Sequence, residues 1–213
     1  MSKNVFLSAL GLPGCGKTTI MKEVSKMLGT NYYFSEPEEK YWGEAVKERE
    51  KVGYFSGLMW FRVNRVPNLI KAKNLYNQGL NVVIDSYYDK AIKNYIGKKG
   101  MEWLIDRDDP YFEIAKDVAK LDWQELPNVT HLVTLSVSKE VWCRNLNIRN
   151  RELDSNSNLL NSYSTQEYFV AAAEELSREF GIEHIRINVD EKTVEEVAHE
   201  IVNKISVKET IVS

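Results

Sequence analysis

Residues 11–18, with the sequence GLPGCGKT, constrain the fold more than any other part of this chain. They match the pattern G-x-x-x-x-G-K-[ST] at every fixed position. The apolar stretch 4–10 precedes them and a helical pattern over 18–28 follows, so the motif occupies a strand-to-helix turn. Glycines let the backbone wrap around an anion, and the N-terminus of the following helix adds its positive end. The sequence therefore predicts a phosphate-binding loop at the first turn of an α/β protein.

The motif also predicts how this loop binds its ligand. In this pattern Lys17 reaches the β- and γ-phosphates of a nucleoside triphosphate, and the Thr18 hydroxyl is a ligand of Mg²⁺. We therefore expect ATP and Mg²⁺ to bind here. A glycine-rich turn with an incidental lysine is the alternative, and the spacing and context of the motif argue against it. The expected nucleotide-binding residues are Gly11, Gly14, Cys15, Gly16, Lys17, Thr18 and Thr19, with Cys15 as a small filler that has no catalytic role.

Strand and helix patterns alternate along the chain. The segments 4–10, 81–85 and 130–137 are apolar runs typical of buried parallel strands, and 32–35 and 184–189 are weaker candidates. Helical patterns cover 18–28, 58–77, 166–180 and 193–205, and Pro67 either kinks or divides the second of these. This alternation predicts a three-layer α/β/α P-loop NTPase fold with a five-stranded parallel sheet.

Length and composition place limits on the kind of protein. The chain has 213 residues, which suits one domain over 1–205 followed by a C-terminal tail over 206–213. A formal net charge of -3 gives no sign of nucleic-acid binding, and no apolar run is long enough to cross a membrane. Two cysteines are too few for a disulfide framework, and the N-terminus does not resemble a signal peptide, so we expect a cytoplasmic protein.

Four later segments resemble one branch of the P-loop kinases. They are 35–42 (SEPEEKYW), 61–65 (FRVNR), the strand-terminal Asp85 and the basic stretch 144–154 (RNLNIRNRELD). In this order, and over about residues 4–205, the chain resembles the thymidylate kinases and deoxynucleoside kinases. The resemblance implies ATP- and Mg²⁺-dependent phosphoryl transfer to a nucleoside or nucleoside monophosphate, with a deoxypyrimidine as the expected acceptor. It also implies a closing lid over about 144–160, and these kinases are often homodimers.

The resemblance assigns roles to residues in those segments. Glu36 would act on the acceptor hydroxyl, and Asp85 would order Mg²⁺. Their positions at strand ends fit such roles, although Glu36 would also suit the first turn of a helix. The lid arginines would contact the donor phosphates, with a solvated helix face as the alternative for each. The expected lid residues are Arg144, Arg149 and Arg151, and those expected at the acceptor base are Trp42, Phe61 and Arg65.

One departure from the family pattern affects the acceptor site. Both families usually carry an arginine directly after the carboxylate of the third strand, and here Ser86 follows Asp85. We hypothesise that Arg62 or Arg65 supplies the missing positive charge. Tyr87 is expected either to line the acceptor pocket or to cover the edge of the sheet. Another small-molecule P-loop kinase and a catalytically impaired nucleotide-binding protein remain as alternatives.

Overall fold

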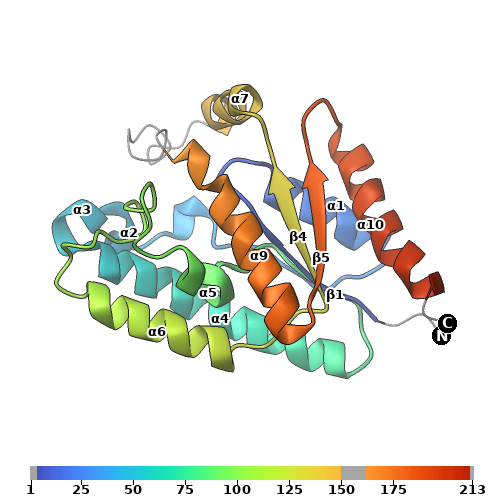
Figure 1. Cartoon of the computed structure of the whole chain (residues 1–213), viewed down its shortest axis with the longest axis horizontal. Coiled ribbons are helices and arrows are strands. Elements are labelled where there is room, and N and C mark those ends of the chain that lie inside the picture. The colour runs from blue at the N-terminus through green and yellow to red at the C-terminus, as the bar shows by residue number, and fades with distance from the viewer. Residues whose placement is uncertain (1–3, 150–161, 212–213) are drawn as a thin grey trace.

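A parallel sheet of five strands forms the centre of the molecule (Figure 1). The computed structural model describes residues 4–149 and 162–211. The strand order is β2-β3-β1-β4-β5, and every neighbouring pair is parallel. This confirms the predicted fold class, and each strand lies within or beside its predicted segment. The strands are β1 (Phe6–Leu10), β2 (Tyr33–Phe34), β3 (Val82–Ile84), β4 (His131–Ser136) and β5 (Glu183–Asn188).

The central strands are apolar on both faces because helices cover both sides of the sheet. All five residues of β1 and all three of β3 are buried. In the register, Leu7 pairs with Val83 on one side and with His131 on the other. Since the strands are parallel, their carboxyl ends meet at a single edge, where polar side chains gather.

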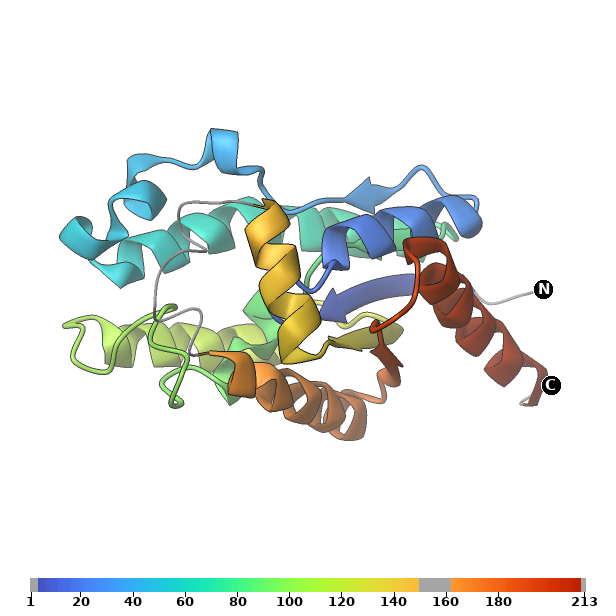
Figure 2. The same ribbon diagram turned by 90° about the horizontal axis from the view of Figure 1, so that it is seen from above.

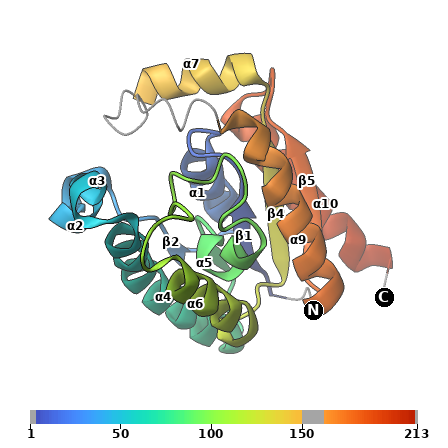
Figure 3. The same cartoon turned by 60° about the vertical axis from the view of Figure 1, so that its left-hand side comes forward.

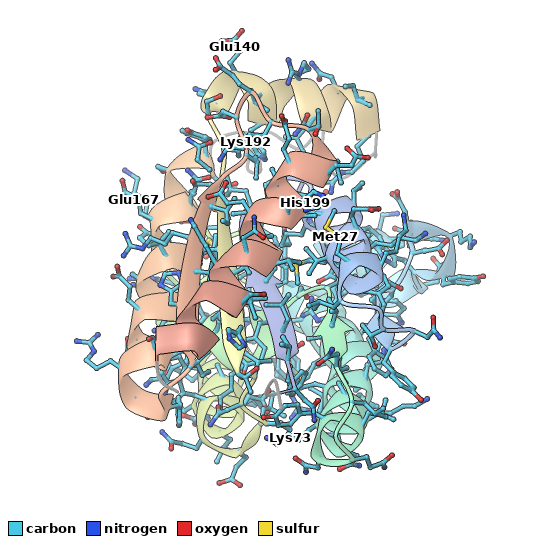
Figure 4. The ribbon with its side chains drawn as sticks, turned by 90° about the vertical axis from the view of Figure 1, so that its right-hand side faces the viewer. Met27, Lys73, Glu140, Glu167, Lys192 and His199 are labelled. Atoms are coloured by element: carbon cyan, nitrogen blue, oxygen red, sulfur yellow. The ribbon has the colours of Figure 1, made fainter. Side chains whose placement is uncertain are left out.

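Helices α1 (Lys17–Met27) and α10 (Val194–Ile211) pack against each other on one face of the sheet. Figure 4 shows α10 in front of α1, with His199 of α10 and Met27 of α1 labelled. Gly29 follows α1 and, as expected, has the left-handed conformation that ends a helix (φ +62°). Helix α10 extends to Ile211, past the end of the helical pattern over 193–205.

The opposite face is covered by α4 (Tyr54–Asn77) and α9 (Gln166–Phe180), with α5 (Tyr88–Ala91) and α6 (Phe112–Glu125) packed beside them. Helix α9 has the predicted bounds. Helix α4 is one continuous helix that contains Pro67, so this residue does not divide it. Sequence patterning did not predict α6, although four of its residues are buried.

Short elements and one crossing helix surround the carboxyl edge of the sheet. Helix α7 (Lys139–Arg149) crosses above this edge, as Figures 2 and 3 show. The predicted lid begins within α7, and its remaining residues 150–160 lie outside the described residues. Within the described ranges, no helix is both long and apolar enough to span a bilayer. The short elements are η1 (Glu39–Tyr41), α2 (Glu44–Lys47), α3 (Arg49–Val52), η2 (Ile92–Asn94) and η4 (Tyr163–Thr165).

Candidate active site

A cavity of about 760 Å³ lies at the carboxyl edge of the sheet, a size typical of small-molecule sites. Its lining comes from the phosphate-binding loop and α1, and from α2, α3 and the start of α4, and Figure 3 shows α2 and α3 to the left of α1. Helix α7 contributes Asn145 and Arg149. Most of the side chains expected at the site line this cavity. These are Lys17, Thr18, Thr19, Glu36, Trp42, Phe61, Arg65, Asp85 and Arg149, together with Gly14 and Gly16.

The loop has the tight backbone that the glycines predicted. Gly14 and Gly16 both have positive φ angles, +85° and +94°. A Cβ atom at Gly14 would lie 2.6 Å from Cδ2 of Leu146 on α7, so this position needs glycine for space as well as for conformation. The indole N–H of Trp142, also on α7, donates to the carbonyl oxygen of Pro13 over 2.7 Å. Helix α7 is thereby attached directly to the loop.

Lys17 is buried within the loop. Its ammonium group donates hydrogen bonds to the carbonyl oxygens of Gly11 and Leu12, each over 3.0 Å, and lies 5.1 Å from the ring centre of Tyr88. Burial opposes the charged form, but Cys15 and Tyr88 raise the pKa of Lys17 above its usual value. The lysine therefore carries a positive charge at the end of the cavity where the motif predicts a triphosphate.

Asp85 and Thr18 form a candidate site for a divalent cation. The Thr18 hydroxyl donates to Oδ2 of Asp85 over 2.7 Å. The other oxygen, Oδ1, is buried and has no hydrogen-bond partner within the described part of the chain. Burial and the nearby Glu36 carboxylate raise the pKa of Asp85. A buried carboxylate oxygen without a donor is suited to a hard cation, so the residues present fit Mg²⁺.

Glu36 lies just after β2 and is held by two donors. It accepts a hydrogen bond from the Ser86 hydroxyl and one from Nη1 of Arg65 at 3.4 Å. Burial works against ionisation, yet the Arg65 guanidinium and the Ser86 hydroxyl hold the pKa of Glu36 below its usual value. Ser86, which replaces the arginine of the family pattern, thus orients this carboxylate.

Arg65 is fixed from several directions. Its Nε and Nη2 donate to the two carboxylate oxygens of Asp89 over 2.8 and 3.0 Å, and only 13% of its side chain is exposed. The guanidinium also lies over the rings of Phe61 and Tyr88, at 5.2 and 5.6 Å from their centres. This side chain lines the cavity and brings a positive charge to it, which Asp89 and Glu36 share.

Two aromatic side chains from different elements meet beside Arg65. The rings of Trp42 and Phe61 pack edge to face, with centres 5.4 Å apart. The Trp42 indole N–H donates to the carbonyl oxygen of Pro37 over 3.1 Å, which secures the segment after β2. These rings give the cavity a rigid apolar wall that suits a flat ligand ring.

Several expected residues lie elsewhere. Arg62 pairs with Asp122 of α6 through two hydrogen bonds of 2.7 and 2.6 Å, and it does not line the cavity. Tyr87 is fully buried and donates to the carbonyl oxygen of Pro127 over 2.8 Å, so it belongs to the core and not to the pocket. Gly11 and Cys15 are buried and do not line the cavity.

The three lid arginines do not share one position. Arg149 lines the cavity, Arg144 is exposed on α7 away from the lining, and Arg151 lies outside the described residues.

Sequence reasoning missed other residues of the site. Asp89 acts through Arg65, and its nearness to Asp85 in the sequence was the one available signal. Ser86 was named only as a departure from the family pattern, and its contact with Glu36 was not predicted. Arg49, Tyr54 and Trp103 also line the cavity. They come from segments that have neither a motif nor a clear helical or strand periodicity, so no sequence pattern pointed to them.

Comparison with protein-family models and with curated protein sequences finds no match. Solved structures do match across nearly the whole chain. A Mycoplasma mycoides deoxyadenosine kinase bound to dATP has a TM-score of 0.68 at 19% identity, with 95% of this chain and 100% of that chain covered. The same enzyme with dCMP and dCDP has a TM-score of 0.64 at 22% identity, with 94% and 98% covered.

A Candida albicans thymidylate kinase gives a similar result. Its TM-score is 0.66 at 15% identity, with 97% of this chain and 93% of that chain covered. Both branches of the expected family are therefore represented among the matching structures. This chain has the fold of the P-loop nucleoside and nucleotide kinases.

Proposed function

We propose that the protein transfers the γ-phosphoryl group of ATP to the 5′-hydroxyl of a nucleoside. The observation that carries this proposal is that one cavity contains the phosphate-binding loop and the ionised carboxylate of Glu36. Phosphoryl transfer requires positioning and charge neutralisation more than covalent chemistry from the protein. The cavity offers groups suited to both tasks.

The donor would bind at the loop end. Lys17 supplies a positive charge, and the loop amides and the N-terminus of α1 favour an anion. Thr18 and Asp85 would hold Mg²⁺, which neutralises charge on the phosphates when bound. Arg149, on the α7 side of the cavity, is suited to contact the donor phosphates from above.

The charge around Glu36 favours a hydroxyl acceptor over a phosphate. The carboxylate can accept a hydrogen bond from a sugar hydroxyl and orient it for attack, whereas it would repel a monophosphate. Arg65 already directs its Nε and Nη2 to Asp89 and Nη1 to Glu36. Its charge is thus shared between two carboxylates, which leaves little of it for a phosphate of the acceptor.

An ADP-release assay with a panel of acceptors tests this proposal. We expect Mg²⁺- and ATP-dependent turnover with deoxynucleosides and little with the corresponding monophosphates. Turnover with monophosphates alone would contradict the assignment of the acceptor. Turnover with a non-nucleoside alone would contradict the whole proposal.

Glu36→Gln is the variant that tests the carboxylate. It keeps the size and hydrogen-bonding shape of the side chain but removes its charge, so we expect kcat to fall by about 10²- to 10⁴-fold. MgATP affinity, measured by calorimetry, should remain close to that of the wild type because the loop is intact. An unchanged kcat with a folded variant would remove Glu36 from the mechanism.

A further inference from the structure

Tyr88 is the first residue of α5 and lines the cavity, yet the mechanism proposed above gives it no role. Its position follows from the sheet. Strand β3 ends beside β1, and the backbone N–H of Tyr87 donates to the carbonyl oxygen of Ala9 on β1 over 3.1 Å. The start of α5 is thereby fixed next to the phosphate-binding loop, which follows β1.

The hydroxyl of Tyr88 binds the first carbonyl group of the loop. It donates to the carbonyl oxygen of Gly11 over 2.5 Å, and the ammonium group of Lys17 donates to the same oxygen over 3.0 Å. A carbonyl oxygen has two lone pairs, so it can accept from both donors. Burial raises the pKa of Tyr88 to about 12, although Lys17 acts against this, so the phenol keeps its proton at neutral pH. Tyr88 and Lys17 are therefore joined through one backbone oxygen.

The ring of Tyr88 lies close to two cations. Its centre is 5.1 Å from Nζ of Lys17 and 5.6 Å from the guanidinium carbon of Arg65. Both distances are within the range over which the face of an aromatic ring attracts a cation. Arg65 in turn donates to Glu36. One side chain thus connects the lysine of the loop to the arginine that holds the carboxylate proposed to orient the acceptor.

Other residues keep Tyr88 in place. The ring of Phe169, on α9, packs against the Tyr88 ring with the two centres 5.7 Å apart. The Tyr95 hydroxyl donates to the backbone carbonyl oxygen of Tyr88 over 3.1 Å. Side chains that are fixed by packing and hydrogen bonds in this way can hold a functional neighbour in a precise position.

The position of Lys17 matters most while charge develops on the transferred group. A displacement of about 1 Å in a positioned group can cost about 10²-fold in rate. We infer that Tyr88 is a positioning residue, which holds Lys17 in the geometry that phosphoryl transfer requires. This inference rests on the proposed function. In this account Tyr88 acts through Lys17 and takes no direct part in the transfer.

The kinetic test compares three variants of the full chain with the wild type. Tyr88→Phe removes the hydroxyl and keeps the ring, and Tyr88→Leu removes both. Tyr87→Phe is the matched control, because the Tyr87 hydroxyl also donates to a backbone carbonyl, that of Pro127, but the side chain is buried and does not line the cavity. For each protein we would measure kcat, KM for a deoxynucleoside, Kd for MgATP by calorimetry, and Tm.

We expect kcat to fall by about 10- to 100-fold in Tyr88→Phe and to fall further in Tyr88→Leu. In Tyr88→Phe, Kd for MgATP and KM for the deoxynucleoside should stay close to the wild-type values, because the interaction lost is one that acts in the transition state. Tyr87→Phe should keep the wild-type kcat even where its Tm is lower. A merely structural role of Tyr88 would instead give the same kcat in both Phe variants.

A spectroscopic signature of Lys17 tests the inference without an acceptor. In NMR spectra that detect lysine ammonium groups, the Lys17 signal is identified by its loss in Lys17→Met. We expect this signal in the wild type and, unchanged, in Tyr87→Phe. In Tyr88→Leu it should move toward the position of a solvated lysine or disappear through exchange with water, because neither the ring nor the hydroxyl then holds the loop. An identical signal in Tyr88→Leu and the wild type would contradict the inference.

The kinetic outcomes separate the inference from the proposed function. A wild-type kcat in Tyr88→Phe, or a higher KM for the deoxynucleoside with an unchanged kcat, would overturn the inference and leave the proposed function intact. Failure of the wild type to phosphorylate any deoxynucleoside would overturn the proposed function and the inference with it.

Discussion

At the residue scale, the site depends on hydrogen bonds and ion pairs among a few charged side chains. Glu36 is kept ionised by Arg65 and Ser86, and Arg65 is in turn fixed by Asp89. From the sequence alone, the replacement of an arginine by Ser86 left a catalytically impaired protein as an alternative. The structure indicates a different role, because the small hydroxyl reaches the carboxylate directly.

Ser86→Ala should change the pH dependence of the reaction. The pKa of Glu36 is below its usual value, so its charged form is present at neutral pH and is lost as the pH falls through that pKa. Removing the Ser86 donor should raise this pKa and move the acidic loss of kcat/KM to higher pH. Ser86→Thr, which keeps the hydroxyl, is the control. If kcat/KM falls at the same acidic pH in the wild type and in Ser86→Ala, the account is contradicted.

At the element scale, α4 connects the site to the rest of the molecule. Along this helix, Arg65 faces the cavity while Arg62 pairs with Asp122 of α6. The motif 61–65 lies on a helix that borders the cavity, with Phe61 and Arg65 in its lining. It could not show which arginine faces inward, because that depends on α6, an element the sequence pattern did not predict.

Arg62→Met should therefore affect stability more than substrate binding. It leaves the carboxylate of Asp122, only 6% exposed, without its partner. Because Arg62 itself is 31% exposed, we expect a loss of about 1–3 kcal/mol in the free energy of unfolding, measured by denaturant titration. The double variant Arg62→Met/Asp122→Leu should recover part of this loss. If the variant instead has a much higher KM for the acceptor and an unchanged free energy of unfolding, then Arg62 acts at the acceptor site and this account of it is wrong.

At the scale of the whole molecule, the strand and helix pattern was sufficient to predict the architecture. Apolar runs bounded by turns predict buried parallel strands, and the loop motif fixes where the first of them ends. The cavity residues outside the recognised motifs could not be predicted in this way. Arg49 and Trp103 are separated by more than fifty residues and meet the same cavity only through the packing of α3 and the loop before α6.

MgATP should stabilise the whole protein if the loop binds it. At a ligand concentration of 100 times Kd, the folded state gains about 2.7 kcal/mol. For a chain of this size this corresponds to a rise in Tm of about 5–10 °C, measured by differential scanning calorimetry. Lys17→Met should lose most of the shift, whereas the control Lys26→Met, at an exposed position of the same helix that does not line the cavity, should keep it. Equal shifts for wild type and Lys17→Met would show that the nucleotide binds elsewhere.

The most direct test of the central claim follows the phosphoryl group itself. ATP labelled at the γ-phosphorus is incubated with the protein, Mg²⁺ and a deoxynucleoside, and the products are separated. Our account predicts label on the 5′-oxygen of the nucleoside, with transfer reduced in both Lys17→Met and Glu36→Gln. Label that stays in ATP, or that appears only as inorganic phosphate, would contradict it.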